Sequence, residues 1–121
     1  MKILIVDDDE FTLQTIAHVL KKDKHTVLTA NDGISALDLI EKENIDLLIS
    51  DVLMPYMSGH GLLSLTKQFY SNTIPVILIS SLNKADAILS KLKLDLGEYD
   101  FLEKPLNFDE LLIKVNHLEK K

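Results

Sequence analysis

The stretch "KILIVDDDE" (residues 2–10) joins an apolar run directly to four consecutive acidic residues. Its first five residues have the length of a strand and are almost continuously apolar, as in strands that are buried on both faces of a sheet. The acids Asp7, Asp8, Asp9 and Glu10 begin where that strand would end. So much negative charge beside a buried strand predicts either the capped start of a helix or a site that binds a cation.

Four further apolar runs of strand length follow, with helical patterns between them. The five runs are "KILIV" (2–6), "TVLTA" (26–30), "IDLLIS" (45–50), "PVILIS" (75–80) and "YDFLE" (99–103). Apolar residues recur at helical spacing within residues 13–20, 34–40, 62–69, 85–96 and 108–118. Strict alternation of strands and helices predicts an α/β fold, a (βα)5 doubly wound parallel sheet of five strands with helices on both faces.

The composition is typical of one globular domain. With 121 residues, 46% of them hydrophobic, the chain has room for one core, and we expect a single domain over residues 1–121. The absence of cysteine excludes disulfides, thiolate metal sites and a cysteine nucleophile. No apolar run has the length of a membrane span, and the first residues lack the features of a signal peptide, so we expect a cytoplasmic protein without membrane contact. All 13 basic residues are lysines and the net charge is −6, so direct nucleic-acid binding by this domain is not expected.

Several residues have ordinary structural interpretations. Asp9 and Glu10 are expected to cap and open the first helix, and Asn107 to cap the last one. The second helix is expected to bury the stripe formed by Ile34, Leu37 and Ile40, after the turn "NDG" (31–33). The histidines show no metal-ligand spacing and are interpreted as surface or boundary residues: His18, His25, His60 and His117.

Polar residues follow four of the five strands. The first strand is followed by Asp7 and Asp8, the third by Asp51, the fourth ends in Ser80, and the fifth is followed by Lys104. In an open α/β sheet, ligands bind outside the carboxyl ends of the strands, so these groups are expected to meet at one edge. Each residue alone would be a cap or a surface residue, and only their combination indicates a site.

The chemistry of this edge suits a phosphate and a divalent cation. Three clustered carboxylates repel one another strongly and need a counter-ion, and hard oxygen ligands without cysteine favour Mg²⁺. Asp51 ends the central strand and can act as a nucleophile, while Asp7 and Asp8 hold the metal beside it. Lys104 and the Ser80 hydroxyl can then contact the oxygens of a new phosphoryl group.

Four segments in the same order resemble the receiver domain of two-component response regulators. They are "ILIVDDDE" (3–10), "DLLISDVLMPYMSGHGLL" (46–63), "VILISS" (76–81) and "FLEKPL" (101–106), and the similarity covers essentially the whole chain. The resemblance implies a flavodoxin-like fold with strand order 2-1-3-4-5. It also implies that Asp7 and Asp8 bind Mg²⁺, that the backbone carbonyl of Leu53 completes the metal shell, and that Asp51 is the phosphoacceptor. By the same resemblance, Lys104 contacts the phosphate, Ser80 is the switch hydroxyl and Phe101 is the switch aromatic. Pro105 is expected to follow a cis peptide.

The same resemblance implies a signalling role. A histidine kinase or a phosphotransfer protein would supply the phosphoryl group, and the domain would catalyse only its own phosphorylation and dephosphorylation. Phosphorylation would then shift an equilibrium between two conformers and alter the face formed by residues 85–96, 99–103 and 108–118. That face is expected to contact a downstream protein or output domain, and it can also carry a homodimer contact. Leu94 and Ile113 are hypothesised to form an exposed apolar patch on it.

Two alternatives remain open on the residues alone. The motif Asp7-x-Asp9 after the first strand resembles the nucleophile motif of haloacid-dehalogenase-like phosphatases, in which Asp7 would be the covalent site. The chain lacks that family's later acidic motif and its cap segment. A receiver that binds partners without phosphorylation is the other alternative, and the presence of both Asp51 and Lys104 argues against it.

Overall fold

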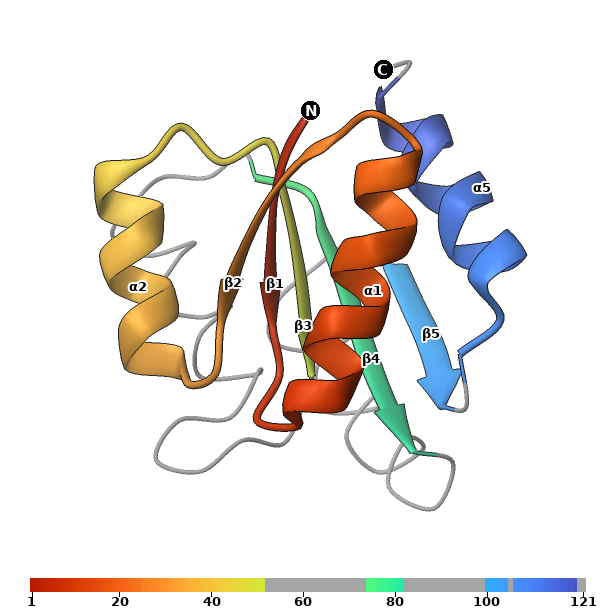
Figure 1. The fold of residues 1–121 in the computed structure, drawn as a ribbon. Coiled ribbons are helices and arrows are strands. Elements are labelled where there is room, and N and C mark those ends of the chain that lie inside the picture. The colour runs from red at the N-terminus through yellow and green to blue at the C-terminus, as the bar shows by residue number, and fades with distance from the viewer. Residues whose placement is uncertain (52–73, 82–99, 105, 120–121) are drawn as a thin grey trace, which may run out of the picture.

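The computed structural model describes residues 1–51, 74–81, 100–104 and 106–119 (Figure 1). The elements are β1 (Lys2–Val6), α1 (Glu10–Lys22), β2 (Thr26–Ala30), α2 (Gly33–Lys42), β3 (Leu47–Asp51), β4 (Val76–Ser81), β5 (Asp100–Lys104) and α5 (Phe108–Glu119). The helices predicted around residues 62–69 and 85–96 lie outside the described residues. Within the described part, no helix has both the length and the hydropathy required to cross a bilayer.

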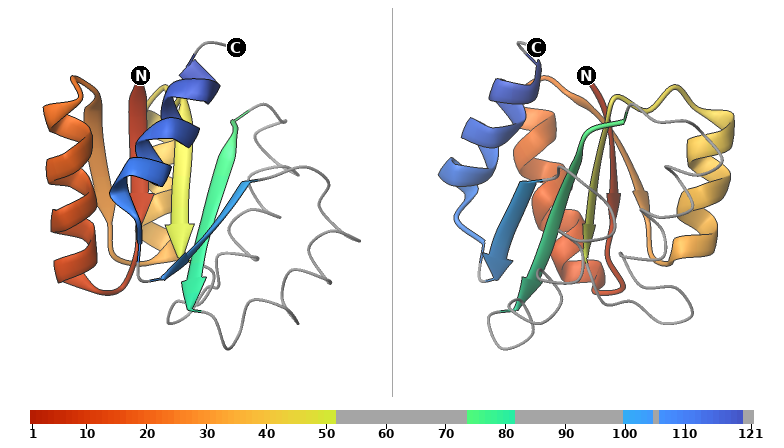
Figure 2. Two further views of the ribbon diagram at one scale, coloured as in Figure 1. Left: turned by 90° about the vertical axis from the view of Figure 1, so that its right-hand side faces the viewer. Right: turned by 180° about the vertical axis from the view of Figure 1, so that it is seen from behind.

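The five strands form one parallel sheet in the order β2-β1-β3-β4-β5. Helices α1 and α5 cover one face and α2 covers the other, as the rotated views show (Figure 2). The predicted α/β fold class and strand order are therefore confirmed. Because all five strands run in the same direction, their carboxyl ends lie at a single edge of the sheet.

The central strands β1 and β3 are mostly apolar because the helices bury both of their faces. Alternate residues of β1 and β3 pack into two cores. Leu4, Val6 and Leu48 face α2, and Ile5 and Ile49 face α1 and α5. The edge strand β2 is more exposed, with only Ala30 buried. The predicted bounds of β1 and β2 match the structure, and those of the other three strands are shifted by one or two residues.

Helix α1 buries the stripe that its periodicity predicts, Leu13, Ile16, Ala17 and Leu20. At its start, Oδ2 of Asp9 accepts a hydrogen bond from the backbone N–H of Thr12 at 3.3 Å, which confirms Asp9 as the cap. The cap fixes the direction in which the chain turns from β1 into the helix.

The end of α1 is closed by a left-handed residue. Lys24 has φ 69°, its N–H donates to the carbonyl of Lys21 at 3.0 Å, and the N–H of His25 donates to the carbonyl of Leu20 at 3.2 Å. These two bonds form a Schellman motif, in which glycine usually occupies the left-handed position. The motif turns the chain back so that His25 lies directly before β2.

The predicted stripe of α2 is wrong at one position. Ile34 is 64% exposed, whereas Gly33, Ala36 and Ile40 are buried and Leu37 is only partly buried. The helix begins at Gly33, so small residues lie against the sheet and the second helical position points away from it. The side chain of Asp32 caps this helix by accepting the N–H of Ser35 at 2.7 Å.

Helix α5 follows its prediction. The Asn107 side chain accepts the N–H of Glu110 at 3.0 Å, so the predicted cap is confirmed. Leu111 and Val115 are buried, and Ile113 is 69% exposed. The second residue of the proposed apolar patch, Leu94, lies outside the described residues.

Replacing Lys24 with glycine should increase the free energy of unfolding. A non-glycine residue in the left-handed region is sterically unfavourable, and the gain should be about 0.5–1 kcal/mol after the greater chain entropy of glycine is subtracted. Urea unfolding of Lys24→Gly measures the change. The matched control is Lys21→Gly, which should destabilise the protein because its backbone is helical. An unchanged or lower stability of Lys24→Gly would contradict the assignment of strain to this turn.

The cap at Asp32 should make stability depend on pH. The backbone N–H of Ser35 stabilises the ionised carboxylate and lowers the pKa of Asp32 below its ordinary value of 3.8. Because this pKa is lower in the folded state than in the unfolded state, the ionised carboxylate stabilises the folded protein at pH values above the unfolded-state pKa. This stabilisation is lost as the pH falls through the folded-state pKa. Asp32→Ser keeps a capping oxygen without a charge, so it should be less stable than the parent near neutrality. Denaturant unfolding at a series of acidic pH values should show the difference in unfolding free energy between the parent and Asp32→Ser becoming smaller as the pH falls. A difference independent of pH would refute this linkage.

Candidate functional site

Three carboxylates converge at the carboxyl edge of the sheet. Asp7, Asp8 and Asp51 each contribute an oxygen atom, and these oxygens all lie within 4.8 Å of one another. Asp7 is fully buried and Asp51 is 8% exposed, whereas Asp8 is exposed. The site therefore consists of two buried carboxyl groups with a third on their solvent side.

Asp7 is held rigidly where β1 ends. Its N–H donates to the carbonyl of Ala30 at 3.2 Å, which ties the end of β1 to the end of β2. Its Oδ1 accepts the N–H of Asp9 at 2.9 Å. These two bonds orient the buried carboxylate, and they leave Asp9 to cap α1. The four consecutive acids thus divide into two site residues and two residues at the start of a helix.

Asp51 ends β3, the strand between β1 and β4. Val6 and Ser50 are the last paired residues of β1 and β3, and Asp7 and Asp51 directly follow them in the two neighbouring segments. The buried hydroxyl of Ser50 donates to the carbonyl of Asp51 at 3.0 Å. No role was predicted for Ser50, although a single hydroxyl residue within an apolar run of the sequence could have pointed to one.

For the other predicted site residues, the structure describes the backbone position alone, or the residue lies outside the described part of the chain. Ser80 lies in β4 one residue beyond Ile79, the partner of Asp51, and Lys104 pairs with Ser81. The backbones of Ser80 and Lys104 therefore reach the edge that carries the carboxylates. Phe101, the second residue of β5, pairs with Leu78 of β4. Leu53 and Pro105 lie outside the described residues, so their predicted roles remain predictions.

The donor atoms of this cluster fit Mg²⁺. They are all carboxylate oxygens, and Mg²⁺ is bound in proteins through one or two carboxylates together with water and phosphate oxygens. Two unit charges 4.8 Å apart repel by about 3 kcal/mol at an effective dielectric of about 20, and less where one group is exposed. A divalent cation removes this repulsion, so the arrangement favours binding of a metal ion and of the phosphate that it can contact.

Removing one charge from the cluster should stabilise the metal-free protein. Asp8→Asn should raise the free energy of unfolding in EDTA by about 1–2 kcal/mol, because repulsion with two buried carboxylates is relieved and the exposed position is partly screened. Excess Mg²⁺ should stabilise the parent more than the variant. Glu41→Gln, in the last turn of α2, removes the same charge away from the cluster and should show neither effect. Equal responses of Asp8→Asn and Glu41→Gln would contradict the electrostatic coupling.

Comparison with known proteins identifies the family. A family model described as the response regulator receiver domain matches residues 3–116. The transcriptional regulatory protein CpxR of Escherichia coli strain K12 is 36% identical over 115 residues, which cover 94% of this chain and 47% of that protein. The chain therefore spans about half the length of this curated relative.

Solved structures agree with this match. The receiver domain of the Francisella response regulator 1452 has a TM-score of 0.87 and 37% sequence identity, with 98% of this chain and 96% of that chain covered. The chemotaxis response regulator CheY4 of Vibrio cholerae has a TM-score of 0.86 and 28% identity, with 97% of each chain covered. Together with the sheet order and the carboxylate cluster, these matches show that the chain belongs to the response regulator receiver domain family, the phosphoacceptor domains of two-component signalling.

Proposed function

We propose that Asp51 accepts a phosphoryl group from the phosphohistidine of a histidine kinase or phosphotransfer protein. The observation that carries this proposal is the convergence of Asp51 with Asp7 and Asp8 at the carboxyl edge of the sheet. Bound Mg²⁺ would neutralise the three carboxylates and contact the oxygens of the incoming phosphoryl group.

The step requires a nucleophile that is held in place beside the metal. An oxygen of Asp51 forms a bond to phosphorus while the P–N bond of the phosphohistidine breaks, and the electron pair stays on the imidazole nitrogen of the donor. Asp7 and Asp8 would hold the metal, and the backbone carbonyl of Leu53 would supply a further ligand. Lys104 and the Ser80 hydroxyl contact the new phosphoryl oxygens.

The burial of Asp7 supports Asp51 as the nucleophile. Asp7 is fully buried, and its Oδ1 accepts the N–H of Asp9, so this oxygen is already engaged and is less available for attack on phosphorus. Asp51 ends β3, which lies between β1, followed by Asp7 and Asp8, and β4, which carries Ser80. A haloacid-dehalogenase-like phosphatase would need Asp7 as its nucleophile and is the less well supported alternative.

The consequence of phosphorylation would be a change of surface. Ser80 would move toward the phosphoryl group, and Phe101 would turn inward, driven by burial of its ring. Ser80 lies in β4, which pairs with β5, and Phe101 lies in β5, the strand that precedes α5 and its exposed Ile113. The altered face, formed by residues 85–96 with β5 and α5, would contact a downstream protein or output domain, and Pro105 after a cis peptide would shape the turn beside it.

The domain is proposed to act through proteins in the cytoplasm. Its net charge of −6 opposes direct binding to nucleic acid, so any effect on DNA would come from another segment or partner. Residues 1–121 would form one receiver domain, whose catalytic contribution is limited to its own phosphorylation and dephosphorylation.

Peptide mapping after incubation with a small phosphodonor and Mg²⁺ tests the proposal. Label should appear on the peptide containing Asp51, and EDTA should abolish it because the carboxylates then repel the phosphate. Asp51→Asn should remove the label, whereas Asp38→Asn, on the surface of α2, should retain it. Label on Asp7, or turnover of many phosphate esters, would instead support the phosphatase alternative.

The exposed apolar side chain on α5 should affect association and leave folding intact. Ile113→Ser should change the unfolding free energy by no more than about 0.5 kcal/mol, because the side chain is largely in solvent. It should weaken self-association of the phosphorylated domain in sedimentation experiments. Ile34→Ser, which removes an equally exposed isoleucine from α2 on the other face of the sheet, is the control. If both variants associate as the parent does, Ile113 is not part of the contact face.

A further inference from the structure

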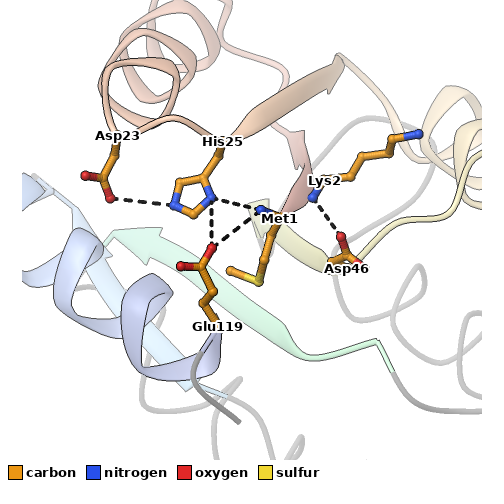
Figure 3. Close-up of polar contacts among 6 residues, drawn as sticks. All are labelled: Met1, Lys2, Asp23, His25, Asp46 and Glu119. Carbon is orange, nitrogen blue, oxygen red and sulfur yellow. Dashed lines mark hydrogen bonds and ion pairs between the residues drawn. The ribbon is translucent and has the colours of Figure 1, made fainter.

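A second polar cluster lies at the edge of the sheet opposite the carboxylates. Figure 3 shows His25 between Asp23 on one side and the nitrogen of Met1 and the carboxylate of Glu119 on the other. The His25 side chain is 3% exposed, whereas those of Asp23 and Glu119 are 39% and 47% exposed. A buried imidazole at this place was not predicted, because His25 was interpreted as a surface or boundary residue. That interpretation is wrong.

Three separate parts of the fold bring these groups together. The left-handed turn at Lys24 positions His25 after α1. The carbonyl of Met1 accepts the N–H of Thr26 at 3.0 Å, which holds Met1 beside β2. The last turn of α5 supplies Glu119. The imidazole therefore lies where the end of α1, the edge of the sheet and the end of α5 meet.

One nitrogen of the His25 ring has a different partner for each of its two protonation states. Nδ1 lies 3.3 Å from the nitrogen of Met1 and 3.6 Å from Oε2 of Glu119. The Met1 nitrogen donates hydrogen bonds whether it is a free amine or the N–H of a peptide bond, so it suits the lone pair of a neutral ring. The carboxylate accepts hydrogen bonds, so it suits the N–H of a charged ring. Gain of a proton would therefore exchange the first partner for the second.

The other ring nitrogen faces a carboxylate in both states. Nε2 lies 3.6 Å from Oδ2 of Asp23, and among the described residues this buried atom has no hydrogen-bond partner. Nε2 carries a hydrogen both in the charged ring and in the neutral tautomer whose Nδ1 accepts. Only the charged ring offers an N–H to each of two carboxylates, one at the end of α1 and one in the last turn of α5. Hydrogen bonds between charged groups are stronger than those between neutral ones.

The last turn of α5 depends on polar contacts because little of it is buried. Val115 is the last buried residue of this helix, and Leu118 is only partly buried. Segments with few buried apolar contacts open more readily than the rest of a fold. We propose that proton uptake by His25 ties the last turn of α5 to the end of α1, through ion pairs with Glu119 and Asp23.

The charges that face the ring set the direction of this effect. They are the carboxylates of Asp23 and Glu119 and, where it is a free amine, the nitrogen of Met1. The lysines nearest in the sequence, Lys22 and Lys24, are exposed to solvent. Histidine ordinarily changes its charge between about pH 5 and pH 8, and a charged ring is attracted to both carboxylates. The link would therefore tighten as the pH falls, and it would act on α5, an element of the proposed contact face.

Amide hydrogen exchange of the last turn of α5, followed by NMR between about pH 5 and pH 8, tests the proposal. After correction for the intrinsic pH dependence of exchange, protection should rise about 2- to 5-fold as the His25 ring gains its proton, because opening the helix end then breaks an ion pair. At the alkaline end, the imidazole nitrogen signals should show the hydrogen on Nε2, as acceptance by Nδ1 requires.

Two variants and two controls identify the residues responsible. Glu119→Gln keeps the length of the side chain and removes its charge, so the pH-dependent gain in protection should fall by at least about half. His25→Gln should abolish it. His117→Gln removes an exposed histidine from the same turn of α5, and Glu110→Gln removes a charge from the first turn of that helix. Both controls should retain the pH dependence of the parent.

A chain with two residues added before Met1 separates the imidazole from any effect of an amino group. The proposed link uses side chains alone, so this chain should keep the pH-dependent protection. Loss of the effect in this chain, or in His117→Gln, would assign the pH dependence to another group and overturn the proposal. An equal effect of pH in Glu119→Gln and the parent, or no effect in the parent, would do the same.

Discussion

The parallel pairing of β1 with β3 is the constraint on which the site depends. The apolar residues of both strands are buried on both faces of the sheet, so their register is fixed by the two cores. That register ends at the pair Val6–Ser50, and the next residue on each strand is an aspartate. Asp7 and Asp51 are thus held side by side at the end of an apolar core, where neither can move away from the other. A divalent cation is the simplest way to relieve this repulsion.

The acidic run after β1 shows how neighbouring identical residues acquire different roles. Asp7 follows the strand and is buried, Asp8 is exposed beside it in the carboxylate cluster, and Asp9 caps α1. The N–H of Asp9 also donates to Asp7, so the start of the helix helps to position the buried carboxylate. The opposite edge of the sheet carries the cluster around His25, which joins the ends of α1 and α5 to the start of the chain.

The fold and the carboxylate cluster could be predicted because they follow from strong local patterns. Continuous apolar runs identified the buried strands, and the rule that parallel strands end at one edge brought Asp7 and Asp51 together from distant positions. The failures have a different origin. Ile34 follows the helical period, but the small residues Gly33 and Ala36 pack against the sheet instead. The burial of His25 depends on a non-glycine Schellman turn and on α5, neither of which a local pattern reveals.

The central claim is that one divalent cation binds between the three carboxylates, and diffraction from a crystal soaked in Mn²⁺ as a substitute for Mg²⁺ tests it most directly. The account predicts one anomalous peak within about 2 Å of carboxylate oxygens of the Asp7, Asp8 and Asp51 cluster. A fully soaked crystal with no peak at this edge of the sheet, or with peaks only elsewhere, would contradict it.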